Sequence, residues 1–199
     1  MPSTVRSLNN RLIEQLNINY MSTQVETPSL SSLEFLAYLN EDGCINEDIQ
    51  GKIGVYAIFN REREMQYVGY SRDVYLSLKQ HLIRQPQSCY WVKIQTIDRP
   101  SRKILDEIAT SWIAQNGSTP AGNDRTASVW NEPIDANPAM TEEEKAQYNQ
   151  NDELGQIKIR KKVARRVEAQ IQQQLSDRGV KMKIRFNPKL KEKGLLDLK

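Results

Sequence analysis

The sequence contains few of the residues that mark secreted, membrane-spanning or zinc-binding proteins. Among its 199 residues there are two cysteines, Cys44 and Cys89, and a single histidine. Two cysteines cannot form a disulfide scaffold, and these two lack the paired spacing of zinc ligands. No apolar run approaches the roughly 18 residues that a transmembrane helix needs, and residues 1–21 lack the apolar core of a secretory signal. We therefore expect reduced thiols, no transmembrane segment and a cytoplasmic location.

Apolar residues are also scarce, and charge is divided unevenly along the chain. They make up 38% of the residues, which is low for a compact fold and too high for a wholly disordered chain. Residues 156–199 contain 14 Lys and Arg against 4 Asp and Glu, a net charge of +10, whereas residues 1–155 carry a net charge of −7. Such a basic segment indicates contact with an anionic partner or with the acidic body of the same protein.

Hydrophobic periodicity divides the chain into four parts. Residues 1–50 form a predicted helical extension, with one short helix over residues 6–16 and a second beginning after Ser31 or Ser32. Residues 51–123 contain the clearest signals, and residues 124–155 form an acidic connector rich in Pro and Asn, with one capped helix over residues 141–148. Residues 156–199 form a basic arm, in which an amphipathic helix precedes a half-buried strand over residues 180–186.

The part from residue 51 to residue 123 has the order strand, strand, helix, strand, helix. The predicted strands cover residues 54–59, 65–70 and 90–96, and the predicted helices cover residues 72–84 and 100–115. This order predicts an α/β or α+β domain, in which helices pack on a small sheet.

The first two strands contain a recognisable pair of tripeptides. Gly54-Val55-Tyr56 is followed, after a gap of ten residues, by Tyr67-Val68-Gly69. A helix follows at once, Glu107 lies in the second helix, and Asn123 follows Pro120-Ala121-Gly122. Together these features resemble the GIY-YIG nuclease family, over roughly a third of the chain. The segment Trp112–Asn123 looks similar to family members of cyanobacteria and plastids, which adds a stroma-like compartment to the expected locations.

The resemblance implies a three-stranded antiparallel sheet flanked by helices, and phosphodiester hydrolysis with one divalent metal ion, Mg²⁺. Tyr56 matches the tyrosine proposed as base or water-positioning group, and Tyr67 matches the tyrosine that faces the scissile phosphate. His81 matches a His or Tyr position of the first helix, Glu107 the metal-binding glutamate, and Asn123 the asparagine that supports the site.

One position departs from the family pattern. Ser77 stands where family nucleases usually carry an arginine, and a serine cannot supply the charge that a guanidinium offers to a phosphate. Arg72 is the best placed substitute. We therefore expect a nucleic-acid-binding protein of this family with weakened or absent cleavage, or else a non-catalytic interaction or assembly factor that reuses the fold.

The same residues also have ordinary structural interpretations. A strand tyrosine is usually a packed core residue with a bonded hydroxyl, and a lone helix histidine usually caps a helix or lies on the surface. Glu107 lies beside Arg102 and Lys103, so an ion pair is the alternative to a metal ligand.

The basic arm is the second candidate site. Its cations form the continuous face expected for contacts with nucleic-acid phosphates: Lys158, Lys161, Lys162, Arg165, Arg166, Lys181, Lys183 and Arg185. Phe186 lies on the apolar side, so no aromatic residue is interleaved for stacking on bases. The alternatives are a solvated helix face, a clasp onto the acidic body, and docking on an acidic protein or membrane surface.

Overall fold

The computed structural model describes residues 29–199, and its centre is one antiparallel sheet of four strands in the order β1-β4-β2-β3. These strands are β1 (Leu36–Ala37), β2 (Ile53–Phe59), β3 (Met65–Ser71) and β4 (Trp91–Ile97). The central strand β2 is buried along almost its whole length, because strands pair with it on both edges and helices cover both faces.

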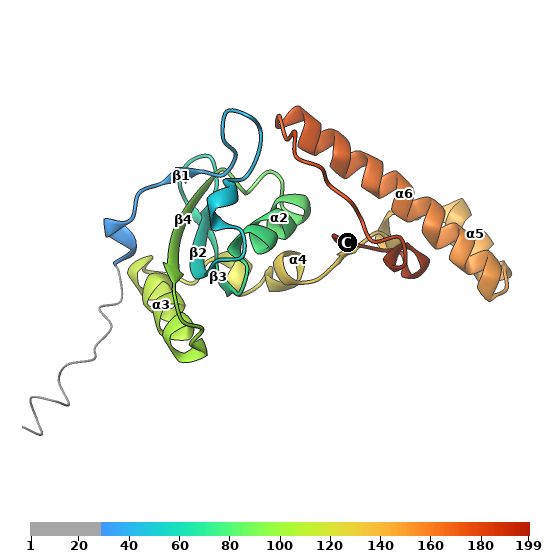
Figure 1. Cartoon of the computed structure of the whole chain (residues 1–199). Helices are drawn as coiled ribbons and strands as arrows, with labels where there is room; N and C mark the ends of the chain where they lie inside the picture. Colours follow the sequence, from blue (N-terminus) through green and yellow to red (C-terminus); the bar gives the residue numbers. More distant parts are fainter. Residues whose placement is uncertain (1–28) are drawn as a thin grey trace, which may run out of the picture.

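Two helices lie on opposite faces of the sheet, α2 (Val74–Arg84) on one and α3 (Arg102–Gln115) on the other (Figure 1). Side chains of β2 alternate between the two faces. Tyr56 and Ile58 belong to the core under α2, whereas Val55 and Ala57 belong to the core under α3. An α+β arrangement, with helices on an antiparallel sheet, is therefore confirmed.

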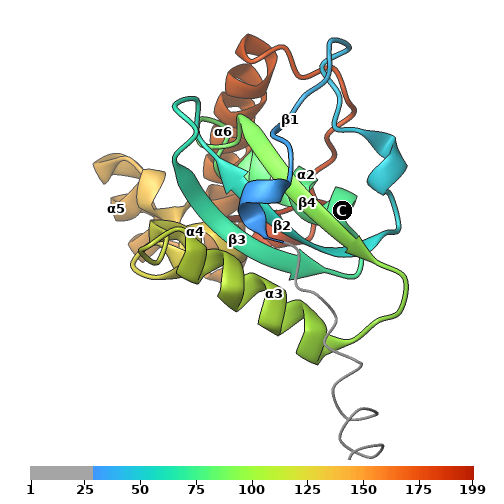
Figure 2. The same cartoon turned by 90° about the vertical axis from the view of Figure 1, so that its left-hand side faces the viewer.

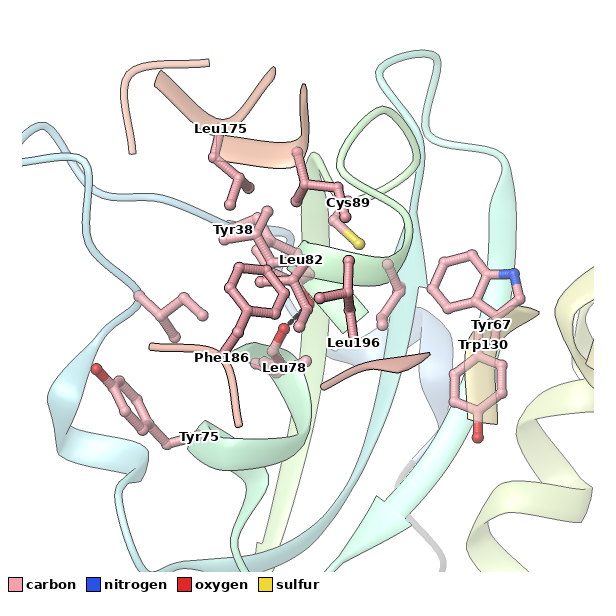
Figure 3. Close-up of a cluster of buried hydrophobic side chains, with 14 of the residues drawn as sticks. Tyr38, Tyr67, Tyr75, Leu78, Leu82, Cys89, Trp130, Leu175, Phe186 and Leu196 are labelled. Carbon is pink, nitrogen blue, oxygen red and sulfur yellow. Dashed lines mark hydrogen bonds between the residues drawn. The ribbon is translucent and has the colours of Figure 1, made fainter. Parts of the chain in front are cut away.

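The C-terminal part of the chain begins beside β3 and then adds a further layer outside α2. It consists of the 3-10 turn η3 (Ala121–Asn123), α4 (Ala127–Asn131), β5 (Ile134–Asp135), α5 (Glu142–Gln150), α6 (Glu153–Asp177) and β6 (Leu195–Leu196). Figures 1 and 2 show α5 and α6 on the side of α2 that faces away from α3. Leu175, Phe186 and Leu196 enter the same core as Leu78 and Leu82 of α2 (Figure 3).

The N-terminal extension differs from the prediction. The helix expected after Ser31 or Ser32 is absent; instead a 3-10 turn, η1 (Leu30–Ser32), leads into β1. β1 pairs with the free edge of β4, which supplies backbone partners that no local sequence signal reveals, and the sheet gains a fourth strand beyond the three expected. The helix predicted over residues 6–16 lies outside the described residues.

Residues 180–186 also differ from the prediction. Their exposure alternates as expected, with Lys181, Lys183 and Arg185 exposed and Phe186 buried. Within residues 29–199 the neighbour of this segment is the end of the chain, which bonds Asn187 and Arg185 but forms a single bridge, Phe186 with Leu198, and no strand ladder. The division of the chain into four parts stays a prediction. None of the helices within residues 29–199 combines the length and hydropathy that a bilayer crossing requires.

Candidate functional site

Four aromatic side chains meet where the sheet, α2 and α4 come together: Tyr56 of β2, Tyr67 of β3, His81 of α2 and Trp130 of α4. We call this group the aromatic cluster. The Tyr56 hydroxyl lies 2.9 Å from Nε2 of His81, and the Tyr67 ring stacks on Trp130 with centroids 5.1 Å apart. All four side chains are buried. The structure therefore brings together three of the predicted site residues, under an aromatic cover that the sequence did not indicate.

Gly69 allows the two tyrosines to lie this close. It pairs with Tyr56 across the β2–β3 ladder. A Cβ atom at Gly69 would lie 2.6 Å from Cε1 of Tyr67 and 2.9 Å from the Tyr56 hydroxyl oxygen. Gly54 is confined in the same way, because a Cβ there would lie 2.5 Å from the Gln95 carbonyl oxygen. Both tripeptide glycines thus have a packing reason in this chain.

Burial decides the protonation states in the aromatic cluster. Desolvation, and then the nearby charge of Arg84, lowers the pKa of His81 to about 3. Desolvation raises the pKa of Tyr56 and of Tyr67. Near neutral pH all three groups are therefore uncharged. A neutral imidazole and a neutral phenol can still exchange protons, but these two groups are buried and bonded to each other, so the arrangement favours a structural role for this hydrogen bond.

Polar groups around the cluster tie further segments to it. The Asn123 side chain bonds both backbone groups of Val68, at 2.8 and 2.7 Å, and so pairs the free edge of β3. The Tyr67 hydroxyl donates to Oδ1 of Asn131 at 2.7 Å. Arg84 donates to the Trp130 carbonyl oxygen and to Asp197, both at 2.8 Å, which joins α4 and the C-terminal segment to α2.

Glu107 and Arg72 lie apart from the cluster. Glu107 is exposed on α3, which covers the opposite face of the sheet, and its carboxylate lies 3.8 Å from the Lys103 ammonium. The ion pair that the sequence offered as the alternative for Glu107 is therefore present. Arg72 is exposed just after β3. Within residues 29–199 no group of three His, Cys, Asp or Glu side chains could hold a metal ion. The expected Mg²⁺ therefore stays a prediction, and we derive no step through it.

Several of the predicted phosphate-binding cations form ion pairs with carboxylates of the same chain. Arg166 donates two hydrogen bonds of 2.8 Å to the buried carboxylate of Glu144, and Lys162 lies 3.3 Å from the same group. Lys161 pairs with Glu192 at 2.8 Å. These cations hold α6 against α5 and against the turn η5 (Leu190–Lys193). We call the contact of Glu144 with Arg166 and Lys162 the Glu144 clamp.

The remaining predicted cations are exposed, and none pairs with a carboxylate among the described residues: Lys158, Arg165, Lys181, Lys183 and Arg185. The last three follow one another on the extended segment, where Met182 and Ile184 pack toward the core. Packing therefore fixes the outward direction of these three side chains.

Two further cations join this face, and sequence reasoning missed them. Lys79 of α2 and Lys199 line one cavity of about 710 Å³ together with Lys183 and Arg185. Lys79 lies more than one hundred residues before Lys183 in the chain, and only the packing of the C-terminal segment beside α2 brings them together. We call Lys79, Lys181, Lys183, Arg185 and Lys199 the basic face.

Comparisons with known proteins give one partial similarity. No family model matches the chain. Among curated proteins, the bifunctional monothiol glutaredoxin-S16, chloroplastic, of Arabidopsis thaliana is 31% identical over 99 residues. The match covers 48% of this chain and 32% of that protein, so the chain spans about a third of the length of its relative.

These findings correct the family expected from the two tripeptides. The relative is named as a glutaredoxin and not as a nuclease, and no family model supports the GIY-YIG assignment. We therefore withdraw the assignment to the GIY-YIG family, the nuclease function drawn from it, and the alternative of an assembly factor built on that fold. The spacing of the tripeptides is real, but in this structure it positions a buried aromatic cluster.

Proposed function

We propose that the chain is a binding module for a phosphate-bearing polyanion, and that the basic face makes the contact. The observation that carries the proposal is the row Lys181, Lys183 and Arg185, which is exposed, free of carboxylate partners among the described residues and fixed by the packing of the residues between them. Nucleic acid is the polyanion we propose. No cleavage step is part of the proposal.

Contacts to phosphates, rather than to bases, suit the chemistry of this face. A cation that neutralises a phosphate releases counterions, and the logarithm of the affinity falls with the logarithm of salt by about 0.7 per contact for single strands and about 0.9 for duplex DNA. The side chains of the basic face are all lysine or arginine, without an aromatic platform for stacking on bases. Binding should therefore depend strongly on salt and little on sequence.

The name of the relative raises thiol chemistry as the other candidate, and the two cysteines support it less well. Cys89 is fully buried, and desolvation raises the pKa of its thiol to about 12. Cys44 is partly exposed, but Glu41 and Asp42 precede it in the same turn, whereas reactive thiolates lie in electropositive surroundings. The relative is also named bifunctional, and the match covers 32% of it. We therefore do not propose that this chain shares a thiol-exchange function with its relative. A plastid location, which the relative's name gives for that protein, is our proposal for this chain.

Oligonucleotide binding tests the proposed function. Fluorescence anisotropy with a labelled single strand and a labelled duplex would be measured at several salt concentrations. The triple variant Lys181→Gln, Lys183→Gln, Arg185→Gln should bind at least about tenfold more weakly, with a salt slope smaller by about two.

A matched control removes the same charge from the far side of the sheet. The variant Arg99→Gln, Arg102→Gln, Lys103→Gln changes three exposed residues at and near the start of α3. It should keep most of the affinity and the salt slope. Equal losses in the two triple variants would show an effect of net charge alone and would overturn the proposal. Tighter binding of polyglutamate than of either oligonucleotide would also overturn the proposal, and would favour an acidic protein partner.

A further inference from the structure

The cavity beneath the basic face lies between α2 and the end of the chain. Leu76, Lys79 and Gln80 of α2 form one wall, and the other is formed by Lys183, Arg185, Leu198 and Lys199. Its volume of about 710 Å³ is in the range of sites that hold small organic ligands.

The charged side chains that line this cavity all carry the same sign. Four lining side chains are cations, and no Asp or Glu is among the lining residues that the structure describes. None of the four forms an ion pair within residues 29–199, although Lys79 lies 6.0 Å from the centre of the Tyr75 ring. Because like charges gathered around one space repel each other, an anion placed between them lowers the electrostatic energy.

Two leucines give the cavity an apolar side. Leu76 is 51% exposed, one of the most exposed large apolar side chains among the described residues, and Leu198 is half-buried. No lining residue is aromatic. A ligand that matches both features carries an anionic group and, next to it, a surface that can cover two leucines.

Hydrogen bonds fix the wall that carries Arg185 and Lys199. The Lys199 amide donates to the Arg185 carbonyl oxygen at 3.0 Å, and the Asn187 amide donates to the Asp197 carbonyl oxygen at 2.9 Å. Asp197 forms a buried ion pair of 2.8 Å with Arg84 of α2, the helix that forms the other wall. The cavity therefore exists before a ligand arrives, which lowers the entropic cost of binding.

We propose that this cavity binds one phosphorylated nucleoside unit. Its phosphate lies among Lys79, Lys183 and Arg185, and its sugar or base covers Leu76 and Leu198. The inference rests on the proposed function, because the unit belongs to the bound polyanion. The inference adds a discrete site to the proposed function. At this site the nucleoside contacts only apolar side chains, so the identity of the base should not affect binding.

Calorimetric titration with AMP, dTMP and inorganic phosphate tests this site. Both nucleotides should bind about tenfold more tightly than phosphate, because only they cover the leucines. Lys183→Gln should weaken all three ligands. Leu76→Asn, at an exposed position that does not endanger folding, should bring the nucleotides close to phosphate. Leu154→Asn is the matched control at a leucine that is 68% exposed on α6, and it should change nothing.

The outcomes separate this site from the proposed function. Nucleotides that bind no better than phosphate, or that are insensitive to Lys183→Gln, would overturn the site, and salt-dependent oligonucleotide binding through the basic face would still support the proposed function. Nucleotide binding in the cavity without any oligonucleotide binding would support the site and overturn the proposed function, the binding of a polyanion. Vesicles of phosphatidic acid and phosphatidylcholine that bind through Leu76, with no binding of nucleotides, would overturn the site in favour of a lipid.

Discussion

The Tyr56 hydroxyl and Nε2 of His81 form one buried hydrogen bond of 2.9 Å between the central strand β2 and α2. Because His81 is uncharged near neutral pH, one of these two groups donates to the other without a formal charge. Nδ1 of the same ring is buried and forms no hydrogen bond of normal geometry within residues 29–199, although the Trp130 backbone nearby slightly favours its protonation. Protonation would place a charge in the core beside Arg84, at a cost that the Trp130 backbone offsets only in part, so this contact makes the fold sensitive to acid.

Stability should therefore fall when the pH drops below the ordinary pKa of histidine. The pKa of His81 is lowered from 6.5 to about 3 in the folded protein. Between these values the unfolded chain takes up a proton that the folded chain refuses, so the free energy of unfolding decreases by about 1.4 kcal/mol per pH unit. Urea unfolding at pH 5.0 should give a value roughly 2 kcal/mol below that at pH 7.5.

The variant His81→Gln provides the control. It should be less stable than the parent at pH 7.5, because the Tyr56 contact is disturbed, and it should lose much less stability on going to pH 5.0. If parent and variant showed the same pH dependence, other groups would be responsible and the neutral state assigned to His81 would be wrong.

Gly69 should not tolerate a side chain. Its Cβ would lie within 3 Å of atoms of both Tyr56 and Tyr67. The Tyr67 ring is held by its stack on Trp130, and Tyr56 by its hydrogen bond to His81. Gly69→Ala should lower the free energy of unfolding by about 1–3 kcal/mol, the usual cost of overpacking a core. Gln66→Ala on the same strand, which introduces no clash, should change it by less than about 1 kcal/mol in the same urea titration. Equal stability of parent and Gly69→Ala would contradict the packing described here.

Local patterns predicted the elements whose residues carry their own signal. The apolar run of residues 54–59 and the period of four in α2 and α6 are properties of short segments, and the structure contains all three elements, with β2 and α2 close to the expected bounds. The sequence did not reveal β1, because Leu36 and Ala37 form a strand only where the distant edge of β4 is free. Residues 180–186 show the reverse case, since their alternation is present but no strand of the described part of the chain pairs with them.

Part of the candidate site could be predicted from local sequence patterns, and part could not. The resemblance predicted one concave site for Tyr56, Tyr67, His81 and Glu107. The first three do meet, but they are buried, and Glu107 is exposed on α3. Trp130 lies on a five-residue helix without a strong pattern, so its cover over Tyr67 could not be predicted. The sequence also shows how many cations the chain contains, but it does not show which of them form ion pairs. Arg166 and Lys183 look alike in a charge plot, but only packing places Glu144 beside the first.

The two thiols should differ sharply in reactivity. Cys89 is fully buried and its pKa is raised to about 12, whereas Cys44 is partly exposed. A disulfide reagent such as Ellman's should therefore titrate one thiol in the native protein and both in urea. Cys44→Ser should abolish the native reaction, and Cys89→Ala should preserve it. Because we do not assign thiol exchange to this chain, Cys44→Ser should also leave oligonucleotide affinity unchanged; a loss there would favour a role for the thiol.

The Glu144 clamp should stabilise the contact between α5 and α6. Glu144 is buried, accepts from Arg166 and Thr141, and its pKa is lowered to about 2, first by the Arg166 hydrogen bonds. Glu144→Gln keeps the shape and removes the charge, so it should lower the free energy of unfolding by about 2 kcal/mol. The exposed neighbour Glu143 offers the matched control Glu143→Gln, with the same change of charge and little effect expected. Because the pKa of Glu144 is depressed, its contribution should be complete above pH 4.5 and disappear as the pH falls toward 2.

Hydrogen exchange and oligonucleotide binding together show whether the clamp is separate from the basic face. In Glu144→Gln the amides of α5 should exchange faster, while those of β2 remain protected. The clamp engages Arg166 and Lys162, and neither belongs to the basic face. Oligonucleotide affinity should therefore be the same in Glu144→Gln and Glu143→Gln. Higher affinity in Glu144→Gln alone would mean that the released Arg166 and Lys162 reach phosphates, and the binding surface would then have to extend along α6.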